Sequence, residues 1–149
     1  MAESLSFGRS HIRHFAVDDD ENHVIDIDTT DTGILARWDK TEKGLSETLA
    51  EIDTLRDTPG ETEEEKAANM SHRFAEIEDK ARAQIDFLFN TDVSGHICAK
   101  YGSLIRTIDG EPFILMVIEK LIGFYAEDIK KDMEKSRKRI EKHTKKYVK

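Results

Sequence analysis

The stretch DIDTTDTGILARWDK, residues 26–40, changes its period halfway along. In its first half acidic and apolar residues alternate, which is typical of a β-strand with one buried face. From Ile34 onward apolar residues recur at steps of four and seven, as they do along one face of an α-helix. We therefore expect the strand to end at Asp28 and the side chain of Thr30 or Asp31 to cap the helix that follows.

The segment before this stretch predicts a β-hairpin. Residues 14–17 and 24–28 have strand-like composition and flank the turn-rich sequence DDDEN. Phe15 and Val17 share one face of the first strand, and Ile25 and Ile27 share one face of the second, because side chains alternate between the two faces. An isolated hairpin is only marginally stable in water, so these faces are expected to pack on a helix or on another chain.

Two helices follow the first one at short intervals. The sequence TPGE, residues 58–61, has the spacing of a capping box with proline at the first helical position, which predicts the start of a second helix. Because the connection is short, the first two helices should run antiparallel as a helical hairpin. A short helix within residues 90–102 is expected to be capped by Thr91 or Asp92 and to end at Gly102.

The last predicted helix follows a turn at Asp109-Gly110 and is opened by Pro112. Its first turns, from Phe113 onward, are apolar on nearly every side and should lie at the buried centre of the molecule. Beyond Ile129 the apolar residues thin out, so the helix should leave the body as a charged arm. The expected fold is mainly α in one domain, with a small N-terminal β-hairpin, a helical hairpin and a long C-terminal helix.

Charge divides the chain into two regions. Residues 130–149 carry ten basic and three acidic side chains, which is +7 in a chain whose total is −8, so residues 1–129 carry −15. We interpret residues 1–129 as an acidic body and residues 130–149 as a basic helical tail. The basic residues of the tail are Lys130, Lys131, Lys135, Arg137, Lys138, Arg139, Lys142, Lys145, Lys146 and Lys149.

Three interpretations of this basic tail stay open. Its charge density is sufficient for contact with the phosphates of a nucleic acid. It also fits a solvated helix face with ion pairs four residues apart, such as Glu134–Lys138. In the third interpretation the tail contacts an acidic body, its own or that of another copy.

The sequence also predicts where the protein is found. Cys98 is the single cysteine, which excludes an internal disulfide and points to a reducing compartment. The longest apolar run, Phe113 to Ile118, is far shorter than the roughly 20 residues of a membrane span. The first residues contain no apolar stretch of the kind found in signal peptides. We therefore expect a soluble, cytoplasmic protein without membrane contact.

Metal, cofactor and catalytic motifs are not recognisable in the sequence. The loop from Asp18 to Thr29 has some calcium-type ligands, but His23 stands where a glycine is needed and Thr29 where a bidentate glutamate should close the site. His96 and Cys98 lack a second ligand pair at zinc spacing, and no acidic residue lies in a nucleophile elbow or a phosphate loop. We expect a hairpin turn, a buried thiol, no metal, no cofactor and no enzymatic activity. An enzyme with an unrecognised site would instead show a cleft that holds two carboxylates with perturbed pKa values.

Three aromatic residues are candidates for contact with a partner protein. Trp38, Phe124 and Tyr125 are named because aromatic side chains anchor protein interfaces. The alternative for each of them is plain burial in the core.

The order of the elements resembles that of the tail assembly chaperones of long-tailed bacteriophages of Gram-positive hosts. A short β element precedes a strand-to-helix joint of the form IDxTDxxxLxRW, here residues 27–38, and an acidic helical hairpin follows. The remaining elements are the segment IDFLF at 85–89, a loop with Gly95 and Cys98, the apolar helix from Phe113 and the Lys/Arg-rich terminus. The resemblance covers most of residues 24–149.

This resemblance implies a protein that is not an enzyme. Chaperones of the family coat the long tape-measure protein, keep it soluble and then give way to tail-tube subunits that polymerise around it. They act in the host cytoplasm and are absent from the finished particle. The implied partners are the tape-measure protein, the tail-tube protein later in assembly, and other copies of the chain.

General physics is consistent with such a role and also leaves an alternative. A chaperone for a long helical chain should offer apolar grooves, and the apolar faces of the first hairpin and of the helix from Phe113 are candidates for them. Strong charge elsewhere would keep it soluble. The alternative is a nucleic-acid-associated or regulatory small protein that uses the basic tail of residues 130–149. Salt-dependent retention on DNA that is lost when the tail is removed would favour this alternative.

Overall fold

The structure is a computed structural model that describes residues 1–7 and 11–145, and it confirms the mainly helical fold class. Lys146 and Lys149 of the basic tail lie outside the described residues. The elements in chain order are β1 (Ile12–Ala16), β2 (Val24–Asp28), α1 (Ile34–Asp53), α2 (Glu63–Phe89), α3 (Ser94–Tyr101), β3 (Thr107–Ile108), β4 (Glu111–Pro112) and α4 (Phe113–Lys145). Short 3-10 turns, η1 (Val17–Asp19) and η2 (Leu55–Asp57), follow β1 and α1.

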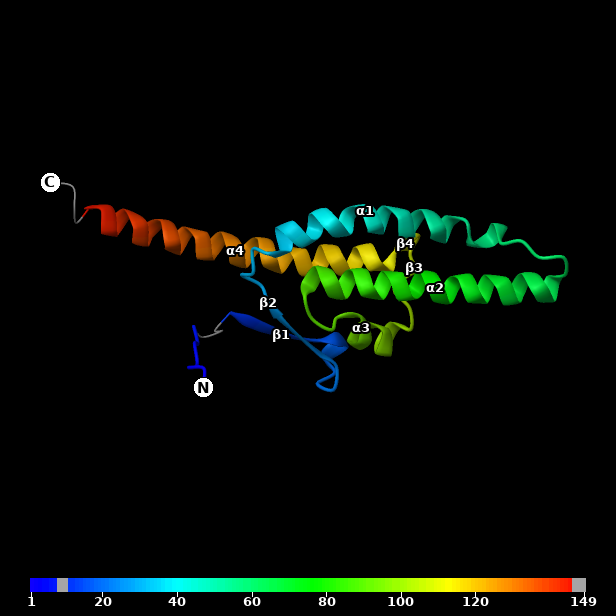
Figure 1. Cartoon of the computed structure of the whole chain (residues 1–149), viewed down its shortest axis with the longest axis horizontal. Coiled ribbons are helices and arrows are strands. Elements are labelled where there is room, and N and C mark those ends of the chain that lie inside the picture. Colours follow the sequence, from blue (N-terminus) through cyan, green and yellow to red (C-terminus); the bar gives the residue numbers. More distant parts are fainter. Residues whose placement is uncertain (8–10, 146–149) are drawn as a thin grey trace.

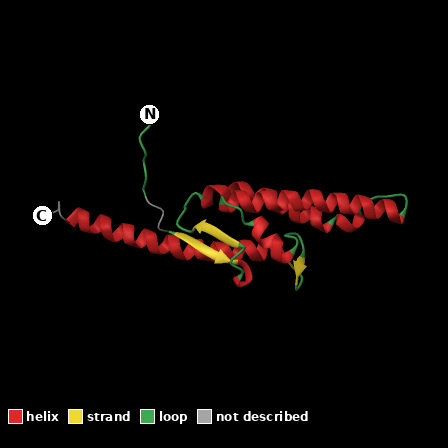
Figure 2. Cartoon of the chain, turned by 90° about the horizontal axis from the view of Figure 1, so that it is seen from below, coloured by secondary structure: helices red, strands yellow, loops and turns green. Residues whose placement is uncertain are grey.

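The helices are staggered along one long axis. Figure 1 and Figure 2 both show α1 and α2 side by side as an antiparallel hairpin, with α4 along only part of its length. At one end the α1–α2 hairpin extends past the start of α4, and at the other end α4 extends past the hairpin. The β1–β2 hairpin and α3 lie beside the central part, so the core is confined to the middle of an elongated molecule.

The β-hairpin has the predicted antiparallel pairing. Phe15 lies opposite Ile25, and Arg13 lies opposite Ile27. Ile25 and Ile27 are almost fully buried, whereas Phe15 is half-buried. The hairpin therefore presents the inner face of β2 to the core, as expected for a hairpin that needs a helical partner.

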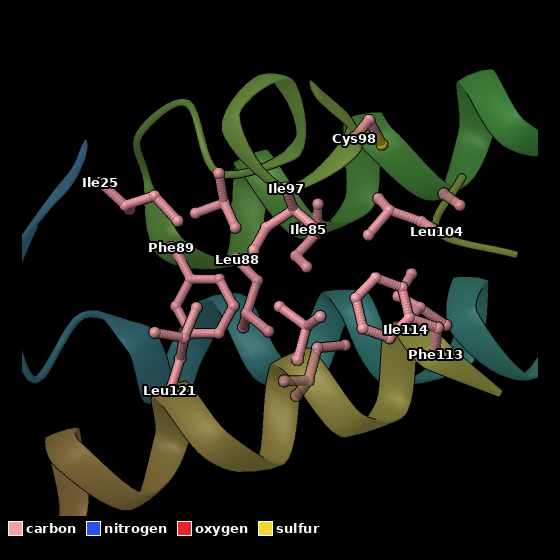
Figure 3. Close-up of a cluster of buried hydrophobic side chains, with 14 of the residues drawn as sticks. Ile25, Ile85, Leu88, Phe89, Ile97, Cys98, Leu104, Phe113, Ile114 and Leu121 are labelled. Atoms are coloured by element: carbon pink, nitrogen blue, oxygen red, sulfur yellow. The ribbon is translucent and has the colours of Figure 1, made fainter. Parts of the chain in front are cut away.

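The core joins the inner faces of α2, α3 and the first half of α4. Figure 3 shows side chains such as Ile85, Leu88 and Leu104 pointing towards Ile114 and Leu121 from α4. Ile85, Leu88, Leu104 and Ile114 have no measurable exposure, which confirms that the apolar first half of α4 lies at the buried centre. Burial of one such side chain is worth about 1.5–3 kcal/mol relative to an exposed position.

The start of α1 differs in detail from the prediction. The cap position is taken by Gly33, and neither Thr30 nor Asp31 occupies it. The Asp31 carboxylate still accepts a hydrogen bond from the Gly33 amide at 2.9 Å, and its other oxygen accepts one from the Arg37 guanidinium at 2.9 Å. The Thr30 amide is already bonded to the Asp28 side chain at 3.1 Å. The strand therefore ends in a local turn at Asp28, which shifts the helix start beyond both predicted caps.

The predicted start of α2 at residues 58–61 is wrong. The cap is Thr62, whose hydroxyl accepts a hydrogen bond from the Glu65 amide at 3.0 Å. The Glu65 carboxylate in turn accepts one from the Glu61 amide at 3.4 Å. Thr58 is occupied elsewhere, because its hydroxyl donates to the Leu55 carbonyl at 2.5 Å. A second sequence with capping-box spacing, TEEE, thus begins the helix four residues later.

The short helix α3 begins at Ser94 and is capped from a distance. Asp86 on α2 accepts hydrogen bonds from the amides of Val93 at 2.9 Å and Ser94 at 2.8 Å. The predicted cap Asp92 accepts from the Gly95 amide at 2.9 Å, but neither Asp92 nor Thr91 is the cap residue, which is Val93. Val93 and Ser94 are buried, so the carboxylate that accepts from their amides comes from the neighbouring helix α2.

Two left-handed turns stand where glycine was expected to end or reverse the chain. Gly102 has a φ of +82° and ends α3, as predicted. Asp109 and Gly110 have φ values of +52° and +81° and form the two-residue turn between β3 and β4. Pro112 is the last residue of β4 and α4 begins at Phe113, so the proline immediately precedes the helix.

Candidate partner-binding surfaces

An open apolar groove lies between the β1–β2 hairpin and α4. Its volume is about 530 Å³. Among its lining residues Asp18 and Lys120 are the charged ones, and the others are Phe15, Ala16, Val17, Ile25, Ile97, Tyr101, Ile108, Phe113, Met116, Val117, Leu121 and Phe124. This volume lies within the range of binding pockets, and the lining is that of a site for apolar side chains.

The wall formed by the β-hairpin is tied to α4 through Asp128. The Asp128 carboxylate accepts a hydrogen bond from the Thr29 hydroxyl and forms an ion pair with Arg13 at 3.2 Å. The Thr29 hydrogen bond and the nearby Arg13 guanidinium hold the pKa of Asp128 below its ordinary value. Next to this pair the Arg13 guanidinium lies 4.5 Å from the ring centroid of Phe124, which packs on Phe15 at 4.7 Å. These contacts hold the β-hairpin against α4 beside the groove.

The other end of the groove is tied to α3. Lys100 pairs with Asp20 at 2.6 Å, and the Tyr101 hydroxyl donates to Asp18 at 2.8 Å. The hydrogen bond with Lys100 lowers the pKa of Asp20, and the hydrogen bond with Asp18 raises the pKa of Tyr101. The acidic hairpin turn, which had calcium-like spacing, therefore serves to anchor the hairpin on α3.

Glu78 fixes the connection between α3 and β3. Its carboxylate accepts from the amides of Leu104 at 2.9 Å and Ile105 at 3.3 Å and from the Ser103 hydroxyl at 2.7 Å. Arg82 pairs with it at 3.2 Å. Burial by itself raises the pKa of Glu78, but these hydrogen bonds outweigh burial and leave the pKa below its ordinary value. From the sequence Glu78 was only one of many acids on a charged helix.

The three aromatic candidates differ in exposure. Phe124 lines the groove and is half-buried, so part of its ring is available to a partner. Trp38 is half-buried against the core, and Tyr125 is only 3% exposed. Burial raises the pKa of the Tyr125 hydroxyl to about 12. A contact role for these residues stays a prediction, and Phe124 is the one of the three that lines the groove.

Nothing in the described part of the chain gathers three or more side chains suitable for a metal ion. His23 and His96, which the sequence leaves far apart, meet with their ring nitrogens 3.4 Å apart. Cys98 is buried as predicted, and burial raises the pKa of its thiol to about 11. A thiol with a raised pKa is a poor nucleophile at neutral pH.

A small hollow of about 240 Å³ brings Asp26, Asp28 and Asp31 close to Tyr125. These carboxylates carry structural bonds: Asp28 accepts from Thr30, Asp31 pairs with Arg37, and Asp26 lies against His14. Their positions are explained by the strand-to-helix joint, which the opening stretch of sequence forms.

The second half of α4 is an exposed basic helix. We call residues 130–145 the C-terminal arm; every one of them is exposed. They carry eight basic and three acidic side chains, a net charge of +5. Met133 and Ile140 are also exposed on it, by 62% and 63%. The predicted departure of this segment from the body is visible in Figure 1.

Known proteins add no information about these surfaces. Comparisons with protein-family models, with curated proteins and with solved structures find no match to this chain. Among the described residues, no helix is both long and apolar enough to span a membrane.

Proposed function

We propose that this protein is a tail assembly chaperone of a long-tailed bacteriophage, which binds the tape-measure protein and keeps it soluble until the tail tube polymerises. The observation that supports this proposal best is the open groove between the β1–β2 hairpin and α4. A helix that presents apolar side chains at steps of three and four residues fits such a groove. A long helical tape-measure protein offers many segments of this kind.

The energetics of the groove suit reversible binding. Burying one large apolar side chain is worth about 1.5–3 kcal/mol, so two or three anchors compete with the cost of association, which is several kcal/mol. Binding by one copy is therefore weak, and many copies along one partner are needed to hold it. Weak single contacts also allow tail-tube subunits to displace the chaperone.

Co-expression with a tape-measure protein tests the proposal. The partner is the tape-measure protein encoded beside this chain, and a tape-measure gene immediately downstream is the expected neighbour. The fraction of tape-measure protein that stays soluble after centrifugation should rise with the chaperone, and the two should co-purify after nuclease treatment. If the solubility of the tape-measure protein does not change, the proposal is wrong.

Two matched variants connect the result to the groove. Met116 is half-buried in the groove lining, and Met116→Glu should abolish the gain in solubility. Leu35 is 68% exposed and is not a groove residue, so Leu35→Glu should retain the gain. Circular dichroism of both variants separates loss of binding from loss of folding. If Met116→Glu retains the gain in solubility as fully as Leu35→Glu does, binding uses another surface.

The C-terminal arm supports a second candidate function, contact with nucleic acid. Lys131, Lys135, Lys138 and Lys142 follow one another at steps of four, three and four along α4, so they form one exposed basic stripe. If four phosphates bind this stripe, the logarithm of the DNA affinity should fall with the logarithm of the salt concentration with a slope of roughly −3 to −4. Removal of residues 130–149 should abolish that binding. Co-purification with the tape-measure protein that survives nuclease would instead favour the chaperone.

A further inference from the structure

The two ends of the molecule are complementary in shape. We call residues 51–76, where the α1–α2 hairpin extends past the start of α4, the hairpin overhang (Figures 1 and 2). In the middle of the molecule α4 lies over α2, whose buried inner row includes Ile77, Ala81, Ile85 and Leu88. The overhang has no third helix. The C-terminal arm at the opposite end is a third helix without a hairpin beneath it.

Apolar side chains continue onto both unpartnered ends. Met70 and Phe74 extend the inner row of α2 by steps of four and three, and they are 37% and 40% exposed. On α4, Ile129 is half-buried, and Met133 and Ile140 follow it at steps of four and seven. Both rows therefore have helical spacing and leave the core at opposite ends.

The charges of the two ends are opposite. The hairpin overhang carries eight acidic and three basic side chains, a net charge of −5, whereas the arm carries +5. Apart from the half-buried Glu51, these acidic side chains are exposed, as are those of the arm. Opposite charges on two complementary surfaces steer them together and fix their register.

The lengths also agree. At 1.5 Å per residue the 16 residues of the arm are about 24 Å long, and the part of α2 from 63 to 76 is about 21 Å long. A copy displaced along the long axis in the same orientation brings its arm parallel to the overhanging part of α2 in the first copy. In the register that sets Ile140 against Phe74, Met133 lies within one turn of Met70.

We propose that the C-terminal arm of one copy lies on the hairpin overhang of the next, so that copies of this chain associate head to tail. The arm then takes the position that α4 holds in the middle of each copy. Because the two surfaces are different and successive copies keep the same orientation, the contact does not close into a ring and adds copies in a row. This inference stands on the two ends of the molecule and does not depend on the proposed function.

Sedimentation velocity of the full chain tests the contact. The weight-average sedimentation coefficient should rise continuously with concentration at low salt and fall when salt is added, because exposed charges are screened. Met133→Ser combined with Ile140→Ser should weaken association about tenfold or more, since two apolar anchors are lost. Both side chains are exposed in the isolated chain, so the variant should fold normally.

Control variants separate this contact from general stickiness or charge. Leu35→Ser with Phe87→Ser removes two exposed apolar side chains elsewhere and should leave association unchanged. Lys130→Glu with Arg137→Glu reverses charges that flank the apolar row of the arm and should weaken association. Lys138→Glu with Lys142→Glu makes the same change in charge on the opposite face of the arm and should weaken association less than the first pair does.

Disulfide trapping gives the geometry directly. In a Cys98→Ala background, Phe74→Cys copies mixed with Ile140→Cys copies should form a cross-linked pair quickly under mild oxidation. Either variant alone should cross-link slowly, because the contact joins unlike surfaces. Faster cross-linking of Phe74→Cys with itself, a particle that stops at a dimer, or a chain that stays monomeric at low salt would each overturn the proposal.

Discussion

Removal of the Glu78 side chain should destabilise the protein far more than its place on a charged helix suggests. In Glu78→Ala the buried amide of Leu104 loses its acceptor, whereas the Ile105 amide keeps its second bond, to the Ser103 hydroxyl at 3.2 Å. A buried donor without a partner costs about 1–3 kcal/mol, and the lost bonds from Ile105 and Ser103 to a charged acceptor add to it, so the predicted loss is roughly 2–4 kcal/mol. The ion pair with Arg82 adds little, because the Arg82 side chain is 40% exposed and solvent screens it.

Glu76 provides a matched control two residues away on the same helix. Its side chain is 64% exposed and pairs with His72 at 3.6 Å, so Glu76→Ala should change the free energy of unfolding by at most about 0.5 kcal/mol. Glu78→Gln keeps one acceptor oxygen and should fall between the two alanine variants. Urea unfolding followed by circular dichroism measures all three variants. A difference of less than about 1 kcal/mol between Glu78→Ala and Glu76→Ala would refute the assignment.

The pH dependence gives an independent measure of the same group. The pKa of Glu78 is lower in the folded chain than its ordinary value, so the carboxylate stabilises the fold above the unfolded pKa of about 4.3. This stabilisation is lost as the pH falls through the folded pKa. The difference in stability between the wild type and Glu78→Gln should therefore be largest at neutral pH and shrink below pH of about 4. A difference that is constant with pH would show that the charge of Glu78 has no role.

Three other changes have expected outcomes that can be measured. Asp86→Ala removes the acceptor for the first amides of α3 and should cost about 2 kcal/mol by urea unfolding; a neutral result would contradict the capping role. Gly102→Ala should destabilise by about 1–3 kcal/mol because its φ is +82°, whereas Gly123→Ala, inside α4 with open space around it, should stabilise by about 0.5–1 kcal/mol. Equal signs for the two glycines would refute the conformational explanation. Asp128→Ala should speed amide hydrogen exchange of β1 and β2 roughly tenfold, because the variant lacks the hydrogen bond from Thr29 and the ion pair with Arg13. Unchanged exchange would mean that the hairpin is held by apolar contacts alone.

The capping residues show where local sequence stops being sufficient. Residues 58–61 and 62–65 both have the spacing of a capping box, and only the second begins α2. The choice depends on Thr58, whose hydroxyl donates to the Leu55 carbonyl of η2 and accepts from Arg73 at 3.0 Å. That contact joins residues 15 positions apart, so the local pattern carries no sign of it.

The site residues divide in the same way. Phe124 was named from its residue type and does line the groove. The roles of Arg13, Asp128 and Glu78 were not foreseen, because each depends on a partner 25 or more residues away in at least one of its bonds. Charged residues are frequent in this chain, and their spacing along a helix does not distinguish a solvated acid from a buried one.

Periodicity, connection length and charge determined most elements and their order: a hairpin, two antiparallel helices, a short helix and a long helix that is apolar first and basic later. The short β3–β4 pair was expected only as a turn. The kinds of element follow from local backbone geometry, which repeats every two or 3.6 residues. The tertiary structure decided the stagger between α4 and the α1–α2 hairpin, and with it the open groove and the two unpartnered ends. Stagger depends on which apolar rows meet across the core, because packing joins residues far apart in the chain and a row of apolar positions does not specify its partner.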